Sequence, residues 1–202
     1  MMRFAGLLGA SAATLVVAAW PAWAANLDRS VLDEINYART HPAEYARDLL
    51  GSRGEDGQYG ARDPRALEEA VDFLERQRPL PPLAADRALA LAAGELTAAQ
   101  GPRGLTGHAG ADGSSPSERL HHRGVWRSMT AEAISYGYST AEGVVRQLII
   151  DEGVSNRGHR MTIFDPNLQI AGARCGRHAV YGYMCVIDFA SAPVVRTPDE
   201  GR

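Results

Sequence analysis

The chain has 202 residues, of which 45% are hydrophobic and 22% are charged, and its formal net charge is −3 at pH 7. This length suits one domain with a full hydrophobic core. The mild acidity argues against a nucleic-acid binder or a binder of anionic membranes, because both classes usually present a basic face.

The first 24 residues have the pattern of an export signal. Arg3 supplies a positive charge, residues 4–19 are apolar, and Ala22-Trp23-Ala24 forms an A-x-A cleavage site. The apolar stretch is too short and too rich in Ala and Gly for a membrane span. We therefore expect cleavage after Ala24 and an extracellular or periplasmic protein without a stable membrane anchor. The alternative is a retained anchor.

Helical periodicity dominates the first two thirds of the mature chain. The first helix is expected to start near Ser30, which has capping-box spacing to Asp33. Pro42 interrupts this helix and suits the first turn of the next one. A glycine-rich exposed loop is expected over residues 51–64. Further helices are predicted over residues 65–77, 86–100, 116–122 and 141–151.

The final third changes to a period of two. A short strand is predicted over residues 131–135, and a hairpin is predicted from residues 168–175 and 181–190. Helices that flank a small antiparallel sheet indicate an α+β fold, and the order of elements leaves open how they are layered. We expect one domain over residues 25–192, followed by a loose tail over residues 193–202.

The two cysteines fall within the predicted hairpin. Cys175 and Cys185 lie at equal distances from Val180, so they face each other if the strands pair antiparallel. Facing positions bring Cβ atoms to about 4.5–5.5 Å, which makes a disulfide geometrically open. An oxidising compartment favours the bridge over two buried free thiols. We therefore predict a disulfide between them.

Four places in the sequence carry candidate site residues. His108 lies in a glycine-rich loop, Glu132 in an apolar strand, and His159 just before Arg160. Asp151 and Glu152 end a helix, and periodicity places either one beside its apolar stripe. Each has a simpler explanation: a solvated loop histidine, an edge-strand carboxylate facing water, or a cation that complements a helix dipole.

Other histidines are expected to have no role in a site. His121 and His122, beside Arg119 and Arg123, are predicted to lie on a solvated face of a helix. His178 falls at the predicted hairpin tip, where the loop explains it. The sequence contains no serine nucleophile elbow, phosphate loop, H-E-x-x-H motif or zinc-knuckle spacing.

Four segments resemble a known family. Residues 32–46 are similar to the opening helix of bacterial CAP/SCP domains. His108 with residues 112–119 resembles their H-x-G-x-D-G-S-S-P-x-x-R stretch, residues 131–134 their A/G-E-N-I signature, and residues 157–160 their closing G-H-R signature. The chain thus resembles the CAP superfamily, which comprises cysteine-rich secretory proteins, antigen 5 and pathogenesis-related proteins.

The resemblance implies an α-β-α three-layer sandwich with a small antiparallel sheet and a central cleft that holds two histidines and two acids. His108, Glu132 and His159 match that set residue by residue. Asp151 aligns with the glutamate of the family's W-x-x-E segment, in which Leu148 stands where the family has tryptophan.

The chemistry of two imidazoles and two carboxylates is limited. Neutral His108 and His159 can bind Zn²⁺ or another divalent metal while carboxylates orient the rings. Two histidines hold an ion weakly unless Glu132 or Asp151 joins them, so an exchangeable metal is expected.

The leading expectation is a secreted, monomeric binding domain whose cleft takes a divalent metal and a small apolar or glycan ligand. Family members are linked to lipid binding, defence and interaction with hosts or envelopes. A metal-assisted hydrolase, with Glu132 as general base on a metal-bound water, is the first alternative. A structural envelope protein, which needs no defined cleft, is the second.

Overall fold

The computed structural model describes residues 22–51 and 63–192. Most of the predicted leader, most of the predicted loop over residues 51–64, and the predicted tail from residue 193 lie outside this part. Seven α-helices are described: α1 (Ala22–Thr40), α2 (Pro42–Gly51), α3 (Pro64–Arg76), α4 (Arg87–Gln100), α5 (Pro116–His122), α6 (Ala141–Ile150) and α7 (Gly158–Ile163). A short 3-10 helix, η1 (Gly101–Arg103), follows α4.

Four strands form one sheet in the order β1-β3-β4-β2. They are β1 (Ala84–Ala85), β2 (Thr130–Tyr136), β3 (Ile170–His178) and β4 (Gly182–Ala190). The hairpin β3–β4 is antiparallel, as predicted, and β2 also pairs antiparallel with β4. The two-residue β1, which was not predicted, pairs parallel to β3 and makes the sheet mixed. It is short because Asp86, which follows it, caps α4.

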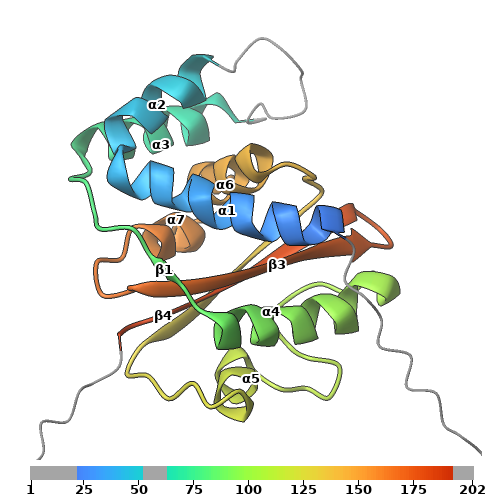
Figure 1. The fold of residues 1–202 in the computed structure, drawn as a ribbon. Coiled ribbons are helices and arrows are strands. Elements are labelled where there is room, and N and C mark those ends of the chain that lie inside the picture. Colours follow the sequence, from blue (N-terminus) through green and yellow to red (C-terminus); the bar gives the residue numbers. More distant parts are fainter. Residues whose placement is uncertain (1–21, 52–62, 193–202) are drawn as a thin grey trace, which may run out of the picture.

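Helices cover both faces of this sheet, which confirms the three-layer α-β-α sandwich (Figure 1). Alternate residues of β4 show the two faces. Ile187 and Phe189 belong to the core cluster that includes residues of α1 and α6, whereas Val186 and Ala190 pack with residues of α4. Because a strand sends successive side chains to opposite faces, residues 186, 188 and 190 all face the layer of α4 and α5.

Helix α1 begins at Ala22 instead of near Ser30, so the predicted start is wrong. Leu27 is buried one turn before Val31, which extends the apolar face of the helix toward the N-terminus. Ser30 is exposed in the middle of the helix. Among the described helices, none combines the length and apolarity that a membrane crossing requires.

The predicted disulfide is confirmed. Cys175 and Cys185 are register partners on β3 and β4, their Cα atoms are 4.0 Å apart, and their sulfur atoms are bonded. Both side chains are buried in the core cluster between the sheet and the layer of α1 and α6. The bridge therefore fixes the hairpin that forms the centre of the sheet.

Candidate functional site

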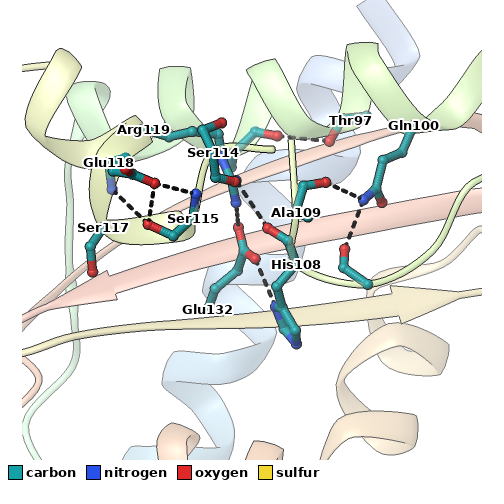
Figure 2. Close-up of polar contacts among 12 residues, drawn as sticks. Thr97, Gln100, His108, Ala109, Ser114, Ser115, Ser117, Glu118, Arg119 and Glu132 are labelled. Atoms are coloured by element: carbon teal, nitrogen blue, oxygen red, sulfur yellow. Dashed lines mark hydrogen bonds and ion pairs between the residues drawn. The ribbon is translucent and has the colours of Figure 1, made fainter. Parts of the chain in front are cut away.

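The loop that carries His108 is held by the end of α4. The buried amide of Gln100 donates hydrogen bonds to the carbonyl oxygens of Gly107, at 2.8 Å, and Ala109, at 2.9 Å (Figure 2). The amide N–H of Gly107 donates to the hydroxyl of Tyr136 at 3.1 Å. Gly107 has φ 94°, a left-handed conformation that favours glycine. These contacts fix the backbone on both sides of His108.

Glu132 links this loop to the sheet and to α5. Its side chain is only 1% exposed. One carboxylate oxygen accepts a 2.8 Å hydrogen bond from Nδ1 of His108, and the other accepts a 2.5 Å bond from Nη2 of Arg119 (Figure 2). The hydrogen bond that His108 donates to Glu132 raises the pKa of His108 above its usual value. The carboxylate therefore holds the imidazole ring in one orientation.

Arg119 corrects the prediction of a solvated face on α5. It is buried, and its Nη1 donates to the carbonyl oxygens of His108, at 3.0 Å, and Ser114, at 2.9 Å. His122 and Arg123 are exposed, whereas the His121 ring stacks on a neighbouring tryptophan. This helix of seven residues thus directs one arginine toward the interior. Helical spacing alone does not predict this, because the partner carboxylate, that of Glu132, lies on a strand.

A second histidine–acid pair lies where α6 ends. Asp151 follows Ile150 with φ 53°, a left-handed conformation, and its side chain is 3% exposed. Oδ1 of Asp151 is 2.7 Å from Nδ1 of His159, and Oδ2 accepts the backbone N–H of His159 at 2.9 Å. Glu152 is exposed. The structure therefore selects Asp151, and not Glu152, as the partner of His159.

The next residue, Arg160, anchors this second pair. Its guanidinium donates to the carbonyl oxygens of Ile149, at 2.6 Å, and Ile150, at 2.9 Å, which end α6. Its Nη1 forms a 3.0 Å ion pair with Glu69 of α3. The last two residues of the G-H-R segment thus have different contacts. His159 contacts Asp151, and Arg160 donates hydrogen bonds to the carbonyl groups at the end of α6.

One cavity of 290 Å³ brings the two histidines together. It lies at the β2 edge of the sheet, and its lining includes His108, Tyr136, Leu148, Asp151, Glu152 and His159. Each histidine uses Nδ1 toward its carboxylate, which leaves Nε2 for a ligand in the cavity. Glu132 lies behind His108 and orients it.

His178, which was predicted to lie at the hairpin tip, is the last residue of β3 and is buried. Its Nε2 donates to the carbonyl oxygen of Leu105 at 2.9 Å, and its Nδ1 accepts the backbone N–H groups of Val180 and Tyr181. The ring also packs edge-on against Tyr136, with centroids 5.3 Å apart. This histidine therefore closes the hairpin turn and supports one wall of the cavity.

Comparison with known proteins identifies the family. The model of the cysteine-rich secretory protein family, CAP, matches residues 32–189, which is most of the chain. A search of curated proteins finds no match.

Solved structures resemble this chain at low identity. An outer surface protein of Borrelia burgdorferi aligns with a TM-score of 0.50 and 15% identity over 80% of this chain and 94% of its own. An extracellular SCP-domain protein of Bacillus anthracis gives 0.48 and 18% over 66% of this chain and 45% of its own. A cysteine-rich secretory protein of Staphylococcus aureus gives 0.40 and 14% over 64% and 40%.

This chain therefore spans less than half of the Bacillus and Staphylococcus structures that it matches. The Borrelia structure supports the fold alone, because its identity is low. Since the family model covers most of the sequence, the chain belongs to the cysteine-rich secretory protein (CAP) family.

Proposed function

We propose that this protein is an exported binding domain whose cleft takes a divalent cation between His108 and His159. The observation that carries the proposal is that both histidines line the same 290 Å³ cavity while a buried carboxylate holds Nδ1 of each ring. In metal sites, a carboxylate on one ring nitrogen fixes the tautomer and raises the basicity of the other. A divalent ion bound to the two Nε2 atoms would polarise a water or carbonyl oxygen in the cavity.

The donor set favours an exchangeable ion over a structural one. Structural zinc sites are closed by four protein ligands, and catalytic sites usually use three. In the part of the chain that the structure describes, no group of three or more His, Cys, Asp or Glu side chains is placed to hold a metal. Two imidazoles completed by water fit a site that loads and releases its ion.

The wall formed by Tyr136 favours a glycan as the organic ligand. Its ring lines the cavity and contacts the ring of Tyr181, with centroids 5.5 Å apart. Tyr181 is 51% exposed, and Leu105 beside the turn is 41% exposed. An aromatic face next to imidazole and carboxylate groups offers a sugar ring both stacking and hydrogen bonds, whereas a lipid chain needs a deeper apolar enclosure.

Binding is favoured over the hydrolase alternative by the state of Glu132. A general base must reach the proton that it removes. The Glu132 carboxylate is 1% exposed, and both of its oxygen atoms already accept hydrogen bonds from His108 and Arg119. It is thus suited to orient His108 and not to activate a water molecule in the cavity.

Export is supported by chemistry at both ends of the chain. The leader pattern ends at Ala24, and the Cys175–Cys185 disulfide is typical of proteins that leave the reducing cytosol. An intact-mass measurement of the secreted protein tests the cleavage. A mature chain that begins at Ala25 is expected, and an uncleaved chain in the membrane fraction would contradict it.

Calorimetric titration with Zn²⁺ tests the cation site. His108→Ala and His159→Ala should each weaken binding about tenfold or more, because each removes one of two ligands. His122→Ala is the matched control: this exposed histidine lies on α5 and is not part of the cleft. If both cleft variants bind Zn²⁺ like the wild type, or the control loses as much affinity, the cation proposal is wrong.

A further inference from the structure

A buried carboxyl group that the proposed function does not use lies beside Glu132. Asp188 of β4 is the register partner of Glu132 on β2, and it is 1% exposed. Facing residues of an antiparallel pair point to the same side of the sheet, here toward α4 and α5. The two acids therefore lie side by side in the buried layer between the sheet and these helices.

The charges around Asp188 do not balance if both acids ionise. Glu132 faces it from β2, Arg119 from α5 and Glu95 from α4. Glu95 is already paired with Arg123. One guanidinium, that of Arg119, thus serves two buried carboxyl groups. Two adjacent buried carboxylates repel each other strongly, so one of them keeps its proton.

Hydrogen bonding indicates that Asp188 is the acid that keeps it. Glu132 accepts from His108 and Arg119, which stabilises its ionised form. An ionised Asp188 can only accept hydrogen bonds, and neither of its oxygens has a partner among the described residues. A neutral Asp188 can instead donate to Glu132. Burial, followed by the negative charge of Glu132, raises the pKa of Asp188 well above its ordinary value.

We propose that Asp188 is a neutral acid in the folded protein at neutral pH and a positioning residue that donates a hydrogen bond to Glu132. Glu132 then accepts from three sides: His108, Arg119 and Asp188. Its carboxylate is fixed in the orientation that aligns the His108 ring with the cavity. This inference concerns the metal-free protein and stands or falls independently of cation binding.

The pH dependence of stability tests the buried proton. The unfolded chain releases the Asp188 proton above a pH of about 4, whereas the folded protein retains it. As the pH rises from about 4 to the pKa of Asp188 in the folded protein, the unfolding equilibrium constant of the wild type should therefore rise. Relative to that of Asp188→Asn, the rise should be up to about tenfold per pH unit. Urea denaturation between pH 4 and 8 without metal measures this ratio. Asp33→Asn, at an exposed position on α1, is the control and should follow the wild type.

Two NMR measurements complete the test. In the wild type, the side-chain carboxyl carbon of Asp188 should keep the shift of a neutral acid from pH 5 to 7, which does not depend on any variant folding. The ring resonances of His108 should move in Asp188→Leu and return in Asp188→Asn, because the amide still donates to Glu132. A carboxyl carbon that titrates near pH 4, or parallel stability profiles for wild type and Asp188→Asn, would overturn the proposal. So would His108 resonances unmoved in Asp188→Leu.

Discussion

The two histidine–acid pairs that share the cleft are built in opposite ways. Glu132 of the first pair meets His108, which is 24 residues away in sequence, and depends on Arg119 from a separate helix. Asp151 of the second pair meets His159, which is eight residues away, and accepts a backbone N–H from the same residue. The first pair is thus assembled by tertiary packing around buried charge, and the second by the way one helix ends and the next begins.

Because of this difference, each histidine–acid pair should be sensitive to a different kind of substitution. The first pair is sensitive to any change in the charge of its buried neighbours, because a carboxylate removed from water requires a cation or donors. The second pair is sensitive to backbone conformation, because Asp151 holds its left-handed φ of 53° while its side chain accepts an amide at the start of α7. Substitutions on the two sides should therefore fail for different reasons.

Arg119→Ala should produce the largest loss. It leaves Glu132 buried without its cation, and breaking a buried ion pair in this way costs about 3–5 kcal/mol. Arg123→Ala, at the residue that directly follows the same helix, removes a partly exposed pair with Glu95 and should cost less than about 1 kcal/mol. Urea denaturation at pH 7 compares the two variants. Equal losses would show that the first pair does not depend on buried charge.

Asp151→Ala should have an intermediate effect, of about 2 kcal/mol, from the lost amide contacts at α7 and from placing alanine in a left-handed conformation. Asp151→Asn keeps one acceptor oxygen and tolerates that conformation, so it should cost less than about 1 kcal/mol. Chemical denaturation measures both. If the asparagine variant loses as much as the alanine variant, charge and not backbone geometry governs the second pair as well.

Several parts of the fold follow from local sequence patterns. The equal spacing of Cys175 and Cys185 about Val180 predicts the hairpin register, which the structure has. The helix over residues 116–122 has the predicted bounds; it begins at a capping box and ends two residues before Gly124. Such features depend mainly on neighbours in the chain. The capping-box spacing of Ser30 and Asp33 shows the limit of local patterns, because α1 starts earlier, at Ala22.

The sequence predictions fail where contacts between residues distant in the chain determine the environment of a side chain. Arg119 was predicted to lie on a solvated face, because its partner, the Glu132 carboxylate, lies on a separate element, β2. Helical spacing does not choose between Asp151 and Glu152, because α6 ends at Ile150 and the next residue leaves the helical path. Asp188 gives no signal in the sequence beyond being an acid within an apolar strand, and only its register with Glu132 reveals it.

The smallest expected effect is the pH dependence of stability that His108 contributes to the first pair. The hydrogen bond that His108 donates to Glu132 raises the pKa of His108, so the folded protein binds this proton more tightly than the unfolded chain. The resulting stability is fully present below the unfolded pKa of about 6.5 and is lost as pH rises through the folded value. Because the His108 side chain is 52% exposed, the contribution should stay below about 1 kcal/mol.

His108→Gln should remove this step, leaving a stability profile that is flatter above pH 6.5 than that of the wild type. The loss attributed to Asp188 begins near a pH of about 4 and should persist in His108→Gln, which separates the two groups on the first side of the cleft. An NMR titration of the wild-type ring gives the pKa directly. A His108 ring that titrates at or below its ordinary value would mean that Glu132 does not hold the imidazolium form. The first pair would then owe its geometry to Arg119 and the loop alone.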